Sequence, residues 1–203
     1  MISTYAELKQ AIERWGKRGD ALSLLDDFID LAESDIWQRL KMRDMDTRST
    51  ATLSTSTRYL ALPTGFLSMR KFKIDQTDVQ DIVIDYRTPE QLYVHERPGV
   101  PCYYTITSQI ELDRVADQAY TVEMQYYASL TALSASNTTN AVLTRYPQVY
   151  LYGSLMHFYN WAQDDEMFNK YALMFDGAIK SANKQESSSR RGSMQMIVNG
   201  WTP

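Results

Sequence analysis

The sequence predicts an α+β protein: an antiparallel helical bundle of about four helices with an inserted antiparallel β region and an extended C-terminal tail. Apolar residues recur at helical spacing near both ends of the 203-residue chain. Between about 49 and 139 the pattern changes to alternation in segments rich in Ser, Thr and Tyr, which favour strands. From 185 the chain is polar and lacks a period. These changes divide it into a helical pair over 1–48, a β-rich insertion over 49–139, a second helical pair over 140–184 and a tail over 185–203.

The first helical pair begins with a capping-box spacing. Thr4 and Glu7 are placed so that each satisfies a free backbone N–H of the other, which predicts a helix over 4–16. A second helix is predicted over 22–41, with Asp26, Asp27, Asp30 and Glu33 facing outward. A short polar link between them favours antiparallel packing. The apolar faces comprise Tyr5, Leu8, Ile12 and Trp15 in the first helix, and Leu25, Phe28, Ile29, Ala32, Ile36 and Leu40 in the second.

The β-rich insertion contains several strand candidates separated by turn signals. Strands are predicted at 49–57, 66–74 and 82–86, and Thr88 followed by Pro89 predicts a short helix over 89–94. A hairpin joins 103–107 to 110–112 across two residues. The alternating run at 120–127 follows, so we predict an antiparallel meander of three consecutive strands.

The C-terminal helical pair has the most regular pattern in the chain. Pro147 fits a first helical turn, and apolar residues follow at helical spacing until Asp164, which can cap the next helix. The tail beyond it is polar over 186–193. An isolated apolar cluster then closes the chain, formed by Met194, Met196, Ile197, Val198 and Trp201.

Composition excludes several classes of protein. The net charge of −4 does not suit a strongly basic nucleic-acid binder, because phosphate affinity requires clustered Lys and Arg. A single cysteine excludes an internal disulfide framework and a Cys-rich zinc site. No apolar run approaches the roughly 18–20 residues of a membrane span, and the N-terminus lacks a signal-peptide pattern, which predicts synthesis in a reducing compartment.

The sequence predicts no catalytic residue, no cofactor and no metal site. It contains neither a Gly-rich phosphate loop nor a Gly-x-Ser-x-Gly elbow. Ser154 and His157 lie on one predicted helix, where packing roles explain them better than a nucleophile–base pair. The acidic clusters at 26–30 and 164–166 fit solvated helix faces and helix N-termini. Cys102 is interpreted as a structural thiol and His95 as a surface residue.

The tyrosines are the main candidates for an interaction surface. Among fourteen, two adjacent pairs fall in predicted strands, Tyr103 with Tyr104 and Tyr126 with Tyr127. Successive strand residues point to opposite faces, so one member of each pair is expected to face outward. Exposed tyrosines are enriched at protein interfaces, which makes these four candidates for contacts with another subunit or a tail protein. Core packing remains the explanation for about half of them.

A series of short motifs resembles the head-to-tail connector (adaptor) proteins of short-tailed bacteriophages. The motifs occur in the same order over about 1–185, and the segment over 137–153 is the most distinctive. They are YAELK (5–9) with Ile12, FIDLAE (28–33) with Arg39 and Leu40, YLALP (59–63), TPEQL (88–92), YYTI (103–106), LTALS (130–134), NTTN (137–140), LTRYP (143–147) and YLYG (150–153).

The resemblance implies a ring, typically of twelve copies, between the portal protein of the DNA-filled head and the tail nozzle protein. The family fold implied is a helical bundle carrying a β insertion, with a C-terminal extension along the portal. The apolar cluster from Met194 to Trp201 is then expected to bind the portal. Double-stranded DNA is expected to pass through the ring without specific binding. The protein is expected in the neck of the virion after synthesis in the host cytoplasm, with no membrane partner.

Two other classes remain open from the residues. The tyrosines and the β-rich middle are compatible with a carbohydrate- or ligand-binding module of the tail. A hydrolase is the weaker alternative, because no nucleophile–base pair can be placed.

Overall fold

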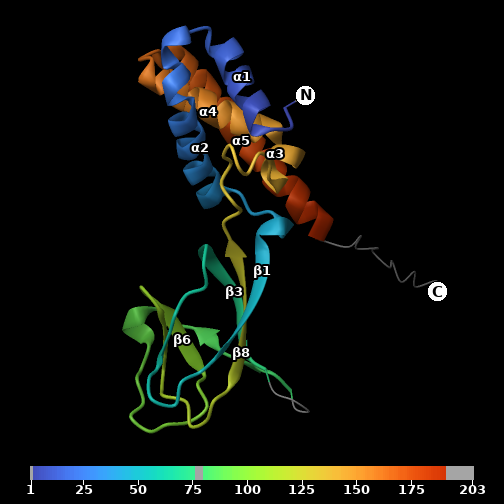
Figure 1. The fold of residues 1–203 in the computed structure, drawn as a ribbon. Coiled ribbons are helices and arrows are strands. Elements are labelled where there is room, and N and C mark those ends of the chain that lie inside the picture. The colour runs from blue at the N-terminus through green and yellow to red at the C-terminus, as the bar shows by residue number, and fades with distance from the viewer. Residues whose placement is uncertain (1, 76–79, 191–203) are drawn as a thin grey trace, which may run out of the picture. The chain divides into compact units, whose positions relative to one another are not determined.

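A computed structural model describes residues 2–75 and 80–190, and its fold is mixed α+β, as predicted (Figure 1). The chain divides into two compact units. Among the described residues, 2–43 and 131–190 form the helical unit, whereas the β-rich unit lies within Asp44–Leu130. The β-rich unit is therefore an insertion between two helical segments of the sequence.

The helical unit is organised around one central helix, α4 (Pro147–Trp161), which contacts the three other long helices. These are α1 (Tyr5–Gly16), α2 (Leu25–Arg39) and α5 (Asp165–Arg190). Two shorter elements complete the unit: the 3-10 helix η1 (Gly19–Leu24) before α2, and α3 (Ala141–Arg145) before α4. Fully buried side chains from all four long helices form its core, among them Leu8, Ile12, Ile29, Ile36, Phe158 and Phe175.

Local sequence signals set the ends and the close packing of these helices. The capping box of α1 is confirmed, because the Thr4 hydroxyl accepts the Glu7 N–H and the Glu7 carboxylate accepts the Thr4 N–H. At the other end of α1, Gly16 lies so near α4 that a Cβ there would be 2.5 Å from the Phe158 ring. Glycine is thus required at Gly16 for the two helices to approach.

The β-rich unit contains two four-stranded sheets. The first has the order β1-β8-β3-β4, and the second has the order β2-β7-β6-β5, in which β5 and β6 are parallel. The 3-10 turns η2 (Arg43–Met45) and η3 (Pro89–Gln91) accompany the strands. The strands are β1 (Asp46–Thr52), β2 (Tyr59–Leu60), β3 (Phe66–Ile74), β4 (Ile82–Val83), β5 (Asp85–Tyr86), β6 (Tyr103–Ile106), β7 (Ile110–Leu112) and β8 (Thr121–Ala128).

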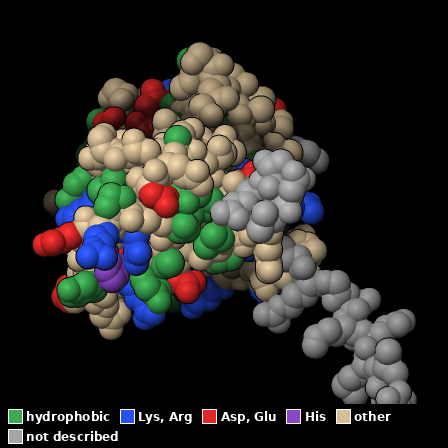
Figure 2. All heavy atoms as spheres, turned by 90° about the horizontal axis from the view of Figure 1, so that it is seen from below, with side chains coloured by type: hydrophobic (Ala, Val, Ile, Leu, Met, Phe, Trp, Pro, Cys, Tyr) green, Lys and Arg blue, Asp and Glu red, His purple; other side chains and the backbone are tan. Residues whose placement is uncertain are grey.

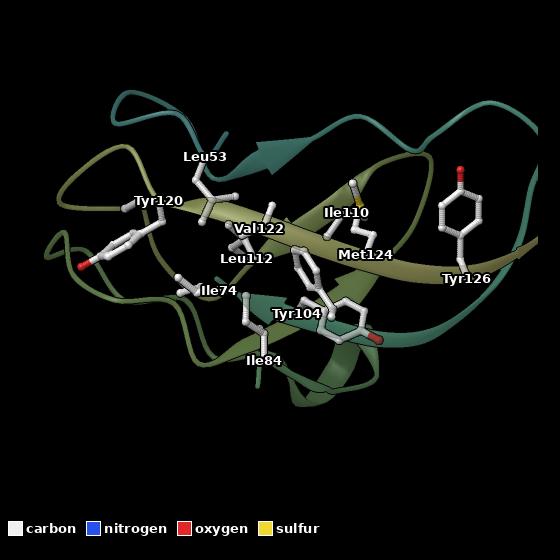
Figure 3. Close-up of a cluster of buried hydrophobic side chains, with 12 residues drawn as sticks. Leu53, Ile74, Ile84, Tyr104, Ile110, Leu112, Tyr120, Val122, Met124 and Tyr126 are labelled. Carbon is white, nitrogen blue, oxygen red and sulfur yellow. The ribbon is translucent and has the colours of Figure 1, made fainter. Parts of the chain in front are cut away.

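Both sheets contribute to one apolar cluster, shown in Figure 3. Every second residue of β8 enters it, namely Val122, Met124 and Tyr126, as expected for a strand with one buried face. Phe72 and Tyr104 meet edge to face at the centre, with ring centroids 5.1 Å apart. The rest of the cluster is Leu53, Ile74, Ile84, Ile110, Leu112, Ala116 and Tyr120.

The prediction of a three-stranded meander is wrong, although its first hairpin is confirmed. β6 and β7 pair antiparallel across a tight turn, but β8 lies in the other sheet, between β1 and β3. Strand length explains the difference. β7 has three residues, whereas β1 and β3 have seven and nine, so the eight residues of β8 pair more completely with them. The helix predicted over 89–94 is also shorter, being reduced to the 3-10 turn η3.

The predicted limits of two helices need correction. The segment before residue 25 is a 3-10 helix, and α2 ends at Arg39 rather than at 41. At the C-terminus, the tail was predicted to begin at 185, but α5 continues to Arg190. The physical reason is Glu186, which is only 3% exposed and fixes the last turns of α5 to the rest of the helical unit.

Glu186 accepts hydrogen bonds from two parts of the helical unit that are far away in sequence. The Tyr146 hydroxyl donates to one oxygen at 3.0 Å, and the backbone N–H of Arg43 donates to the other at 3.1 Å. The guanidinium of Arg145 is 3.5 Å from the same carboxylate. Since a buried carboxylate is costly without partners, this set of donors explains why the polar end of α5 remains helical.

Glu33 was predicted to face outward on α2, but it is buried, with 3% exposure. Its Oε1 accepts the backbone N–H of Leu133 at 2.8 Å and the Tyr150 hydroxyl at 2.8 Å. The side-chain amide of Asn140 donates to the same hydroxyl oxygen at 2.6 Å. Burial raises the pKa of Glu33, and these hydrogen bonds oppose the increase.

The raised pKa of Glu33 predicts a pH-dependent stability. The native state holds the proton to a higher pH than the unfolded chain, so the penalty for the buried charge is absent in acid and grows as pH rises through the native pKa. Glu33→Gln keeps an acceptor oxygen and removes the charge. The free energy of unfolding of the variant, minus that of the wild type, should therefore increase from pH 4 to pH 8. Urea unfolding at both pH values measures the difference, and a gap that does not change with pH would contradict the assignment.

Glu186 predicts where the chain can be shortened. A chain ending at 185 loses the acceptor for Tyr146 and Arg43 and should lose about 1–3 kcal/mol of stability. A chain ending at 190 keeps Glu186 and should unfold with the same free energy as the full chain. Urea denaturation compares the three, with Glu186→Ala in the full chain as the matched control. Equal stability of the two shortened chains would show that Glu186 has no such role.

Candidate interaction surfaces

One carboxylate from each acidic cluster, Asp26 and Asp164, has a role within the fold. Asp26 accepts the Tyr5 hydroxyl at 2.6 Å and pairs with Lys9 at 2.5 Å, and these contacts lower the pKa of Asp26. Asp164 accepts the N–H of Met167 and caps α5, as predicted. Within residues 2–75 and 80–190, no group of three or more His, Cys, Asp or Glu is arranged to hold a metal ion. In the same ranges, no helix has the length and apolar character required to span a membrane.

Ser154 and His157 do not form a nucleophile–base pair. The Nε2 atom of His157 lies 2.9 Å from Asp35, which joins α4 to α2. Ser154 is fully buried, and its hydroxyl has no hydrogen-bond partner among the described residues. Both side chains therefore belong to the packing of the bundle, as the sequence indicated.

Each tyrosine pair contributes one ring to the core of the β-rich unit. Tyr104 and Tyr126 are buried, with 6% and 4% exposure, and burial raises the pKa of Tyr104. Tyr103 and Tyr127 are half-buried. The alternation is therefore as predicted, and it removes Tyr104 and Tyr126 from the surface on which another protein could bind.

The rings of the two half-buried tyrosines, Tyr103 and Tyr127, are each in contact with an arginine side chain. The Arg87 guanidinium lies 4.7 Å from the centre of the Tyr103 ring, and that of Arg70 lies 5.3 Å from the Tyr127 ring. Arg70 also pairs with Asp46. Arginine stacked on an aromatic ring offers a flat surface with directed hydrogen-bond donors, which suits a protein contact.

The β-rich unit also exposes large apolar side chains outside the two tyrosine pairs. Figure 2 shows apolar and charged side chains side by side on one face. In the β-rich unit, four large apolar side chains within 83–94 are exposed. Tyr93 is the most exposed of them, at 77%. Val83 and Tyr86 lie in the short strands β4 and β5, inside the strand predicted over 82–86. Tyr93 and Val94 follow η3 in a loop, where no alternation separates outward side chains from inward ones. The four are Val83, Tyr86, Tyr93 and Val94.

A buried aspartate holds the loop that carries Tyr93. Asp113 is fully buried, and its carboxylate accepts the N–H of Cys102 at 3.0 Å and pairs with Arg114. Its backbone carbonyl accepts the N–H of His95 at 2.7 Å. The His95 ring lies against Tyr93, with centroids 5.2 Å apart, so Tyr93 is presented by a fixed loop. The thiol of Cys102 is exposed.

The remaining candidates from the sequence lie at the C-terminus. Met194, Met196, Ile197, Val198 and Trp201, expected to bind the portal, lie outside the described residues.

Comparison with known families decides the class of protein. Residues 3–197 match the family model described as SU10 adaptor protein, a match that extends over both the helical unit and the β-rich unit. The chain belongs to the SU10 adaptor family. No curated protein matches it. Membership confirms the resemblance read from the motifs, and the role that it carries is that of a phage head–tail adaptor.

An adaptor of this family is a structural protein. Its general partners are the portal and the tail. The useful features are then the surfaces described above rather than a pocket with reactive groups.

The burial of the tyrosines gives a direct test of the surface assignment. Tyr104→Ala should destabilise the protein by about 3–5 kcal/mol, because it leaves a cavity beside Phe72. Tyr103→Ala should cost well under half of that, since its ring is half-buried. Thermal or urea unfolding of the two variants measures the difference. Similar losses would mean that both rings belong to the core.

Proposed function

We propose that this adaptor forms a ring of twelve copies between the portal and the tail nozzle, seals the filled head and gives DNA a channel into the tail. The observation that carries the proposal is the family match over residues 3–197. A matched single domain would leave the rest of the chain without a role, whereas this match includes both units. The ring, its number of copies and its position in the neck are parts of the proposal that the adaptor role supports.

Charge supports a channel that does not hold DNA. Twelve copies at −4 each carry a net charge of −48. A ring of this sign offers little counterion release to a duplex, which is the main source of non-specific affinity. DNA should therefore pass through without specific binding.

The candidate surfaces can be divided between the partners. We assign the C-terminal cluster that includes Met194 and Trp201 to the portal, because a short apolar run after a polar segment suits insertion into pockets of a larger protein. We assign Tyr93 with its exposed neighbours, together with Tyr103 and Tyr127, to contacts with the nozzle or an adjacent subunit. Twelve weak contacts in one ring gain by avidity.

Attachment to the portal tests the proposal. A chain ending at 190 should fold and yet fail to bind portal-containing heads, and it should not complete infectious particles. The control keeps the length and replaces Met194, Met196, Ile197, Val198 and Trp201 by serine, which should fail in the same way.

Electron microscopy of filled heads mixed with each purified chain shows whether a ring is added below the portal. Normal attachment of the shortened chain would overturn the assignment of the tail. Failure of the full chain to add any ring would overturn the proposed function itself.

A further inference from the structure

A groove lined by aromatic side chains lies on the helical unit between α1 and α5. Its volume is about 310 Å³. Side chains from the end of α1, from α4 and from the start of α5 surround it, and α2 contributes none. The lining residues are Arg14, Trp15, Lys17, Tyr159, Met167 and Tyr171.

The floor of the groove is held in place by aromatic contacts. Tyr159 and Tyr171 are stacked, with centroids 5.2 Å apart and planes 4° apart. The Tyr159 hydroxyl donates to the backbone carbonyl of Trp15 at 3.1 Å. The Trp15 side chain was expected on the buried face of α1, but it is 45% exposed at the edge of the groove. The groove is thus a preformed apolar site that nothing in the described residues fills.

The charged side chains that line the groove are both cationic, although the chain as a whole is acidic. The lining contains Arg14 and Lys17 and no carboxylate. Neither cation forms an ion pair within the part of the chain that the structure describes, and the ammonium group of Lys170 lies over the Tyr171 ring at 5.6 Å. A fitting partner therefore carries an apolar side chain beside negative charges.

The outer face of α2 has this composition. Leu31 is 50% exposed, and it lies beside the exposed carboxylates of Asp27 and Asp30. In the described residues neither of these carboxylates forms an ion pair, unlike Asp26. Asp27 and Leu31 are four residues apart, so they share one face of the helix, about 6 Å from each other.

We propose that the groove of one subunit receives the outer face of α2 from a second copy of this chain. Leu31 of that copy enters the aromatic groove, and its Asp27 and Asp30 approach Arg14 and Lys17. The two surfaces belong to different helices, so the contact is heterologous and repeats from copy to copy. When such a contact repeats and the last copy meets the first, the copies form a closed ring. The inference therefore rests on the proposed function, and it identifies the two surfaces that join neighbouring subunits of the ring.

Chemical cross-linking of the full chain tests the contact without disturbing it. Gln10 and Ser34 are exposed neutral residues, one beside the cations of α1 and the other on the outer face of α2. The variant Gln10→Cys with Ser34→Cys, in a Cys102→Ser background, should form a ladder of trimers and larger species with a short bismaleimide at high protein concentration. The control replaces Ser34→Cys by Ser181→Cys, an exposed position on α5, and should give at least tenfold less of these species.

Charge reversal then tests the chemistry. Arg14→Glu with Lys17→Glu should suppress the ladder, and adding Asp27→Lys with Asp30→Lys should restore it. A ladder equal to that of the control, dimers alone, or no rescue would overturn the contact. Cross-links to portal or nozzle protein at these positions, in assembled particles, would show a different occupant and overturn it as well.

The same particles separate this inference from the proposed function. Rings seen below the portal, with no cross-link between copies at these positions, would reject the α2 contact and leave the adaptor ring in place. Absence of any ring would reject the proposed function.

Discussion

The helical unit depends on two buried carboxylates that fix the chain where the β-rich insertion leaves and returns. Glu186 accepts the N–H of Arg43, the last residue of the unit before the insertion. Glu33 accepts the N–H of Leu133, three residues after position 130. An insertion of 87 residues frees its two flanking segments to move unless something holds them. Since removing one partner of a buried charged group leaves the other unsatisfied, these contacts hold both segments firmly to the bundle.

The network around Glu33 also explains why the returning segment becomes helical where it does. Asn140 caps α3 by accepting the Leu143 N–H, and its amide donates to the Tyr150 hydroxyl, which in turn donates to Glu33. One chain of hydrogen bonds therefore joins α2, the cap of α3 and the middle of α4. A polar network of this kind stabilises only when every member has a partner, and here each does. Asn140, the last residue of the NTTN segment in the most distinctive stretch of the family resemblance, belongs to this network.

The sequence predicted the structure correctly where the interactions join residues close together in the chain, and incorrectly where they join distant residues. The capping box at Thr4, the stripes of α4 and α5 and the β6–β7 hairpin depend on residues a few positions apart. Glu33 and Glu186 have partners 100 and 143 residues away, so helical periodicity placed Glu33 on the outer face and the lack of a period placed Glu186 in the tail. The prediction for β8 was wrong for the same reason, because its partner strands β1 and β3 precede it by more than forty residues. Alternation correctly separated Tyr103 from Tyr104, whereas exposed Tyr93 lies in a loop where no periodicity operates.

Each unit has its own core, so the surface residues of one unit can change without affecting the core of the other. The β-rich unit is stabilised by its own cluster around Phe72 and Val122, and the bundle by residues such as Ile36 and Phe158. A substitution at Tyr93 leaves the bundle core unchanged, and one at Trp15 leaves the β-rich core unchanged. Surfaces that meet different proteins can then vary separately, provided that each core remains intact. Within the helical unit, Glu33 and Glu186 hold the two segments that flank the insertion, so we expect these carboxylates to constrain the protein more than any single surface residue.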